Sequence, residues 1–136
     1  MEKHFVTYDQ ALDLKDLGFK ESCFGEWRQW DGGYPWLQLY QDLDGCSTDD
    51  SDYQYTTEAL APLKSQVFEW ARDEYGLYHI VHHFEHNKNT TKEFLSEVTG
   101  KLLMGNDDIS GFSYHSTYND GESACIDILI EIIKNK

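Results

Sequence analysis

The chain has 136 residues, with 25 Asp and Glu against 11 Lys and Arg, and a formal net charge of −14 at pH 7. Nucleic acids and anionic membrane surfaces are bound mainly through Lys and Arg, so this balance argues against both as direct partners. Hydrophobic residues make up 40% of the chain and aromatic residues 15%, which predicts a single folded domain over residues 1–136 rather than a disordered polypeptide.

Neither a membrane span nor an export signal is recognisable in the sequence. No apolar run approaches the roughly 20 residues that a transmembrane helix needs, and residues 1–5 lack an apolar stretch behind a basic flank. Cys23, Cys46 and Cys125 lie far apart and form no Cys-x-x-Cys pair, which disfavours a disulfide framework or a zinc knuckle. We therefore expect a cytoplasmic protein with reduced thiols.

The first predicted element is a helix over about residues 8–17. Thr7 can cap its N-terminus, and Gln10 stands three residues later, at the spacing of a capping box. Ala11, Leu14 and Leu17 follow at helical spacing. Gly18 is a natural C-terminal stop.

An aromatic hairpin is predicted next. Residues 24–30 and 36–41 favour strands, and Asp31, Gly32 and Gly33 supply the turn between them. A polar, acidic loop over residues 42–52 follows, and residues 53–57 are consistent with a short third strand.

The second half begins with a helix from near Ala61, with Pro62 in the first turn and Gly76 as its stop. A strand is expected from Leu77 to about Glu85. Residues 87–104 leave two readings open: a short helix begun at Thr90 and stopped by Gly100, or a strand with an alternating apolar face. Residues 109–118 alternate as a strand.

The last predicted helix starts after Asn119 or Asp120, either of which can cap it, with Glu122 in the first turn. Its apolar arc is broad, as expected of a helix packed on a sheet, and consists of Cys125, Ile126, Ile128, Leu129, Ile130, Ile132 and Ile133. Together the elements predict an α+β fold: one compact domain, a mostly antiparallel sheet, and about three helices packed on one face.

Four histidines within eight residues, His79, His82, His83 and His86, form one candidate metal site. On a helix they would share one face, but the surrounding sequence favours a strand. There His79 and His83 point one way and His82 and His86 the other, and the members of each pair lie about 13 Å apart at 3.3 Å per residue. That separation is too large for one zinc ion, so ordinary polar positions on a sheet are the preferred interpretation, with a metal-dependent protein as the alternative.

The acidic stretch is the second candidate site. Residues 29–63 contain no Lys or Arg, and residues 1–60 carry 13 of the acids against 4 bases. The segment only faintly resembles a calcium loop, because glycine stands at its fourth position and Tyr53 at its twelfth. Its candidate binding residues are Asp42, Asp44, Asp49, Asp50 and Asp52.

The third candidate is a patch formed by Trp30, Trp36 and Tyr40 beside the acidic stretch. An aromatic patch with a charged rim has the composition of a protein-binding surface, although packing against the final helix would also explain these residues. Catalytic signatures such as Gly-x-Ser-x-Gly and His-Glu-x-x-His are missing from the sequence, so catalytic residues are not assigned and a non-enzyme is favoured.

Three segments carry a resemblance: residues 5–25 (FVTYDQALDLKDLGFKESCFG), 62–79 (PLKSQVFEWARDEYGLYH) and 122–134 (ESACIDILIEIIK). Together they resemble small proteins of Bacteroidetes phages and prophages. Residues 42–57 and 82–108 depart from that pattern. The resemblance implies a phage or prophage origin and a compact α+β domain, but neither an activity nor catalytic residues.

These observations lead to one functional hypothesis. We expect a small acidic, cytoplasmic protein without a cofactor that engages a host protein of basic surface through its acidic and aromatic residues. A sharper version is DNA mimicry in defence evasion, which requires the acids to form a continuous band on one face. The alternatives are the metal-dependent protein built on the histidines and a phage structural or assembly protein.

Overall fold

The computed structural model describes residues 2–30, 32–40, 55–83, 94–100 and 113–135. The chain divides into two compact units, residues 1–63 and 64–136. Each unit has its own three-stranded antiparallel sheet. The α+β class and the antiparallel strands are therefore confirmed. The division of the strands between two sheets was not expected from the sequence, and a single domain over 1–136 stays a prediction.

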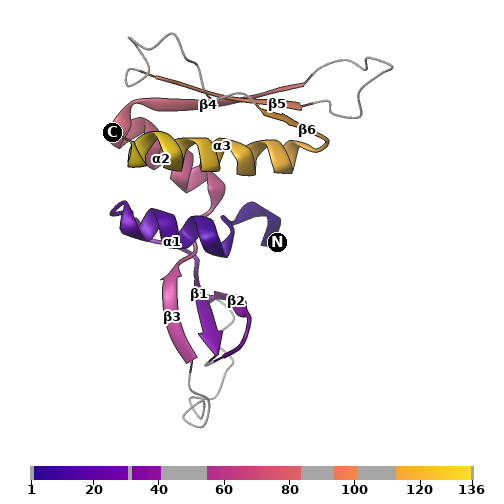
Figure 1. Ribbon diagram of the computed structural model, residues 1–136. Helices are drawn as coiled ribbons and strands as arrows, with labels where there is room; N and C mark the ends of the chain where they lie inside the picture. The colour runs from indigo at the N-terminus through magenta and orange to yellow at the C-terminus, as the bar shows by residue number, and fades with distance from the viewer. Residues whose placement is uncertain (1, 31, 41–54, 84–93, 101–112, 136) are drawn as a thin grey trace. The chain divides into compact units, whose positions relative to one another are not determined.

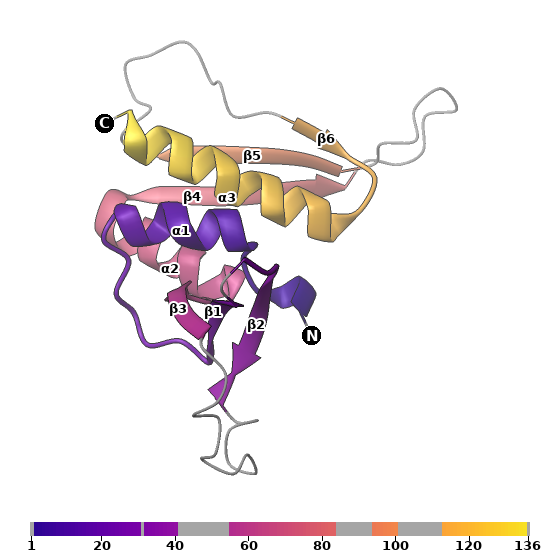
Figure 2. The ribbon, with the colours of Figure 1, turned by 60° about the horizontal axis from the view of Figure 1, so that its bottom comes forward.

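The first unit holds a short 3₁₀ helix η1 (Glu2–His4), helix α1 (Tyr8–Asp16) and strands β1 (Gly25–Trp30), β2 (Pro35–Leu39) and β3 (Tyr55–Leu60). The strands lie side by side in the order β2-β1-β3, with β1 in the centre (Figures 1 and 2). Helix α1 contacts β3. The predicted hairpin is confirmed, and β3 extends three residues beyond the predicted third strand.

The two ends of α1 are fixed by local signals. Thr7 and Gln10 form the expected capping box, in which the Gln10 backbone N–H donates to Thr7 Oγ1 at 3.2 Å and the Thr7 N–H donates to Gln10 Oε1 at 3.0 Å. At the other end Gly18 has a φ of +89°, and the N–H of Phe19 donates to the carbonyl of Leu14 at 3.0 Å. This Schellman motif turns the chain back so that Phe19 follows Leu14 into the core.

The second unit holds helix α2 (Lys64–Tyr75), strands β4 (Leu77–His83), β5 (Phe94–Gly100) and β6 (Ser113–His115), and helix α3 (Tyr118–Lys134). Its sheet has the order β4-β5-β6. Helix α3 contacts all three strands, and α2 contacts β4 and α3. Figure 1 shows both helices on the same face of this sheet.

Three predicted boundaries are corrected in this unit and at its start. Helix α2 begins at Lys64 rather than near Ala61, because the Pro62 carbonyl accepts from the Val6 N–H and Leu63 bridges Phe5. The residue that caps α3 is Thr117, whose Oγ1 accepts from the Asp120 N–H at 3.1 Å. Tyr118 is consequently the first residue of α3 and not the end of a strand.

Of the two readings for residues 87–104, the helix is wrong for the part that is described. Residues 94–100 form β5, which pairs with β4 along its whole length from Leu77 opposite Gly100 to His83 opposite Phe94. Long-range pairing outweighs the local helical pattern here. The remaining residues of that stretch lie outside the described part of the chain.

The core of the second unit forms between α3 and the sheet. Cys125, Ile126 and Leu129 of α3 are almost fully buried, as predicted, together with Leu77 of β4 and Val98 of β5. Ile128 and Ile132 are only half-buried, because the helix face that packs is centred on Cys125, Leu129 and Ile133. Among the described residues, no helix is long and apolar enough to cross a membrane.

Candidate functional site

The β1–β2 hairpin gathers the predicted aromatic residues on one face of its sheet. Arg28 lies opposite Trp36, and Glu26 opposite Gln38. Because alternate residues of a strand share a face, Glu26, Arg28 and Trp30 of β1 lie on the same face as Trp36 and Gln38 of β2. The other face carries Trp27, whose ring meets Tyr8 of α1 edge-on at 6.0 Å.

We call Trp30, Trp36 and Tyr40 the aromatic face. The rings of Trp30 and Trp36 stack, with 4.7 Å between their centroids and 21° between their planes. Trp30 is 39% exposed and Tyr40 37% exposed. The structure therefore brings the two tryptophans together as a stacked pair, with Tyr40 just beyond the end of β2.

An ion pair that the sequence analysis did not identify lies on the same face. Arg28 Nε is 2.6 Å from Glu26 Oε1, and the two side chains are only 9% and 13% exposed. Tyr40 donates its hydroxyl proton to Glu26 Oε2 at 3.3 Å. The sequence contains a signal for this pair, because Glu26 and Arg28 stand two residues apart on a predicted strand and this spacing places both side chains on one face.

The Tyr40 hydroxyl is held in its protonated form. Burial raises the pKa of Tyr40, and the negative charge of Glu26 raises it further, against a smaller lowering by Arg28. The phenol thus remains a donor to Glu26 at neutral pH. Glu26 consequently links Arg28 to Tyr40, and the three side chains hold this end of the hairpin in one arrangement.

The acidic candidates Asp42, Asp44, Asp49, Asp50 and Asp52 lie outside the described residues, but the residues flanking their segment are described. On one side the Tyr40 N–H donates to the Phe24 carbonyl at 2.9 Å. On the other side Tyr55 pairs with Trp30. Both flanks of the segment therefore belong to the sheet that carries the aromatic face.

The histidine candidates of β4 are placed on opposite faces of the second sheet. His79 stacks on Phe68 of α2, with centroids 3.4 Å apart and 8° between the rings. His82 Nε2 lies 2.7 Å from Glu97 Oε2 on the other face, and the His83 ring lies 5.1 Å from that of Phe94. His86 lies outside the described residues.

The environment of His79 favours a neutral ring. Burial lowers its pKa, and the nearby Arg72 lowers it further. Among the described residues, the structure brings together no group of three or more His, Cys, Asp or Glu side chains that could hold a metal ion. The alternation predicted for a strand, with His79 and His82 apart, is thus the observed arrangement.

The two described cysteines are poor nucleophiles. Burial raises the pKa of Cys23 to about 11, with a further contribution from Glu21. Burial also raises the pKa of Cys125, which has no exposed surface and donates weakly to the Ile80 and Glu97 carbonyls. Neither thiol suits covalent catalysis at neutral pH. Cys46 lies outside the described residues.

A scan against protein-family models found no match to this chain, and searches of curated proteins and of solved structures found none either. The resemblance to Bacteroidetes phage proteins therefore stays a prediction. The candidate site is defined by its own geometry: a stacked tryptophan pair, a buried ion pair on the same face, and an acidic segment joined to the same sheet.

Proposed function

We propose that this chain is a small non-enzymatic protein that binds another protein, one with a basic surface, through the aromatic face and the acidic segment that follows it. The observation that carries the proposal is the Trp30–Trp36 stack on the hairpin, in which Trp30 is exposed and Trp36 is half-buried. Tryptophan and tyrosine dominate binding energy at protein interfaces, because rigid rings bury much area at a small loss of conformational entropy.

The acidic segment supplies the second half of the proposal. It stands between two strands of the sheet that carries the aromatic face, and it contains five aspartates and no base. A charged rim around an aromatic centre accelerates association with a partner of opposite charge and suppresses wrong partners. With a phage or prophage origin, the partner would be a host protein in the host cytoplasm.

Substitutions in the aromatic face provide the main test. A partner is first captured from a host lysate and purified, and its affinity is then measured by calorimetry against the wild type, Trp30→Ala and Trp36→Ala. We expect a one-to-one complex and a loss of at least about tenfold in each variant, the range of an interface hot spot. Tyr34→Ala is the matched control, because Tyr34 lies in the turn of the same hairpin and is 92% exposed.

Two results would contradict the proposal. One is a purified partner that binds Trp30→Ala and Trp36→Ala as tightly as it binds the wild type. The other is the failure of any protein to bind in a fixed stoichiometry. Tyr34→Ala should change the affinity by less than twofold, which separates the loss of an aromatic residue in general from the loss of the stacked pair.

The acidic segment is tested by its salt dependence. Replacing Asp49, Asp50 and Asp52 with Asn should slow association at low ionic strength and bring the rate close to that of the wild type at high salt, because salt screens exposed charges. Stopped-flow mixing measures these rates. An unchanged association rate at low salt would remove the acidic segment from the proposal and leave the aromatic face.

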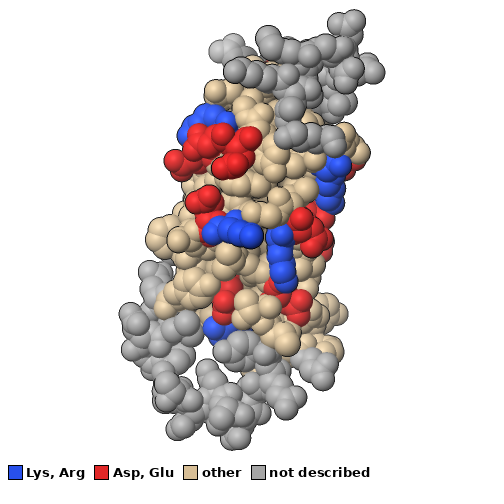
Figure 3. Space-filling model, turned by 90° about the vertical axis from the view of Figure 1, so that its left-hand side faces the viewer, with Lys and Arg blue, Asp and Glu red and all other residues tan. Residues whose placement is uncertain are grey.

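DNA mimicry is a finer form of the same proposal. In Figure 3, Lys and Arg side chains lie next to Asp and Glu side chains on the face that is drawn. The mimicry proposal is therefore built on the acidic segment. Its test is competition: a short DNA duplex should displace the protein from its partner.

A further inference from the structure

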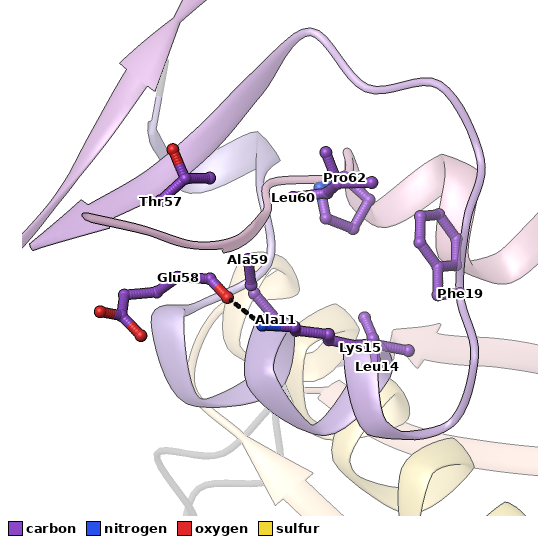
Figure 4. A pocket seen from close by; sticks show the side chains of 9 residues that line it. All are labelled: Ala11, Leu14, Lys15, Phe19, Thr57, Glu58, Ala59, Leu60 and Pro62. Carbon is purple, nitrogen blue, oxygen red and sulfur yellow. Dashed lines mark hydrogen bonds between the residues drawn. The ribbon is translucent and has the colours of Figure 1, made fainter.

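The first unit contains a cavity that takes no part in the proposed interface. Its volume is about 280 Å³, and it lies between α1 and β3 (Figure 4). The residues that line it are predominantly apolar: Ala11, Leu14, Lys15, Phe19, Thr57, Glu58, Ala59, Leu60 and Pro62. For comparison, an apolar cavity of roughly 150 Å³ in another protein holds a benzene molecule.

The cavity follows from the residues where the helix and the strand meet. Ala11 on α1 and Ala59 on β3 are both buried, and their single methyl groups leave the space between the two elements unfilled. Leu14 and Phe19 form another part of the lining, where the Schellman motif turns the chain back. The buried side chains of Ala11, Leu14, Phe19 and Ala59 therefore form the inner walls of the space, whereas Lys15 and Thr57 of the lining are exposed to solvent.

Lys15 is the one cationic residue of the lining. Its Nζ donates to the backbone carbonyl of Glu58 at 2.9 Å, which holds the ammonium group at the cavity. An ammonium group has three protons, and this bond uses one of them. The Glu58 carboxylate accepts from Thr56 Oγ1 at 2.7 Å, and Figure 4 shows it pointing away from the other lining side chains.

We propose that this cavity binds a small carboxylate with a short aliphatic chain. The chain occupies the space bounded by Leu14, Phe19 and Ala59, where it loses its contact with water. The carboxylate accepts a charge-assisted hydrogen bond from the Lys15 ammonium group. Apolar walls with one placed polar group are the usual composition of a small-molecule site.

Octanoate and 1-octanol are the probes, because they share one chain and differ in the charged head. Calorimetric titration of the full chain is done near physiological ionic strength, where the Debye length of about 8 Å limits repulsion by the net negative charge. We expect octanoate to bind one-to-one and about tenfold more tightly than 1-octanol. Equal affinity for the two probes would overturn the recognition of a carboxylate.

Three variants locate the site. Lys15→Met keeps an unbranched apolar side chain and removes the ammonium group, so it should weaken octanoate binding about tenfold and leave 1-octanol binding unchanged. Lys20→Met is the matched control, since Lys20 does not line the cavity, and it should bind octanoate as the wild type does. Ala59→Leu fills the space and should abolish the binding of both probes.

Circular dichroism verifies that Ala59→Leu remains folded. If that variant loses its fold, Ala11→Val adds a smaller side chain to the other wall and should reduce the binding of both probes. Octanoate binding that survives the filling of the cavity, or that falls equally in Lys15→Met and Lys20→Met, would overturn the proposal. So would the absence of octanoate binding to the wild type.

Discussion

Trp27 carries the one side-chain N or O atom in the described part of the chain that is buried without a hydrogen-bond partner, its indole Nε1. The residue is 5% exposed and lies on the central strand of the first sheet. A buried donor without an acceptor loses its bond to water and gains nothing in return, which costs about 1–3 kcal/mol. Packing of the Trp27 ring against Tyr8 offsets this cost.

This assignment predicts the response of Trp27 to substitution. Trp27→Phe removes the unpaired N–H and keeps an aromatic ring, so the free energy of unfolding should change by less than about 1.5 kcal/mol. Trp27→Ala leaves a cavity and should cost about 3–5 kcal/mol. Urea denaturation measures both changes. A loss in Trp27→Phe as large as that in Trp27→Ala would show that the N–H has a partner after all.

His79 gives the second prediction at the scale of the residue. Its pKa is lowered by burial and by Arg72, so the unfolded chain binds the proton more readily than the folded chain does. The contribution of His79 to the free energy of unfolding is therefore fully present above pH 6.5, the ordinary pKa of histidine. It is lost as the pH falls toward the lower pKa of His79 in the folded chain.

Between pH 7.5 and 5.5, the protonation of His79 should lower the free energy of unfolding of the wild type relative to that of His79→Gln, by at most about 1.4 kcal/mol per pH unit. The pH dependence of the two proteins should therefore differ. His83→Gln is the matched control, because His83 is exposed on the same strand. Denaturation at a series of pH values provides the measurement, and an identical dependence in His79→Gln and the wild type would contradict the assignment.

At the scale of the element, polar side chains help to join α3 to its sheet and to α2. Ser96 of β5 is fully buried and donates its hydroxyl proton to the Gly121 carbonyl at 2.6 Å. Lys64, at the start of α2, is also buried, and its Nζ donates to Asn119 Oδ1 at 2.6 Å. Burial lowers the pKa of Lys64. Polar side chains therefore fix the first turn of α3 against both β5 and α2.

Gly121 provides the prediction at this scale. A Cβ atom at this position would lie 2.9 Å from Val81 Cγ1 and 3.3 Å from Ser96 Oγ. Alanine is more favourable than glycine inside a helix by about 1 kcal/mol. At this position the new methyl group would be too close to its neighbours, so Gly121→Ala should instead destabilise the protein by about 1–3 kcal/mol. Thermal denaturation measures the change.

The cause is checked with Val81→Ala, which removes the methyl groups that the new Cβ would meet. The double variant Gly121→Ala with Val81→Ala should be more stable than the sum of the two single changes predicts, because the two side chains share one space. Additive effects would mean that the cost of Gly121→Ala does not come from this contact.

At the scale of the whole molecule, the net charge of −14 affects the stability of the folded state. Asp and Glu outnumber Lys and Arg by 14, so repulsion between the acids exceeds their attraction to the bases. A large net charge destabilises the folded state through this repulsion, and salt screens it.

We consequently expect the melting temperature to rise as NaCl is increased from about 10 to 150 mM, the range over which the Debye length shortens from roughly 30 to 8 Å. Differential scanning calorimetry provides the measurement. Replacing Asp49, Asp50 and Asp52 with Asn should raise the melting temperature at low salt and reduce its dependence on salt. A melting temperature that falls with NaCl would mean that attractive pairs outweigh the repulsion.

Features that depend on neighbouring residues were predicted well from the sequence. The capping box of α1, the glycine stops of α1 and α2 and the hairpin turn all follow from short-range hydrogen bonds and from allowed backbone angles. The stacked tryptophans were predicted as one patch, and the pairing of Arg28 with Trp36 in the hairpin places Trp30 and Trp36 on the same face. The start of α2 was predicted three residues too early, because it depends on contacts of Pro62 and Leu63 with residues 5 and 6.

By itself, the sequence determined the charge, the acidic stretch without a base, the α+β class, the capping box of α1 and the glycine stops of α1 and α2, because each follows from composition or from residues a few positions apart. Only the tertiary structure decided which strands share a sheet, that residues 94–100 form a strand, that Arg28 and Glu26 are buried as a pair, and that Ala11 and Ala59 bound a cavity. Each of these depends on segments brought together from distant parts of the chain, and local periodicity carries no information on which surfaces will meet.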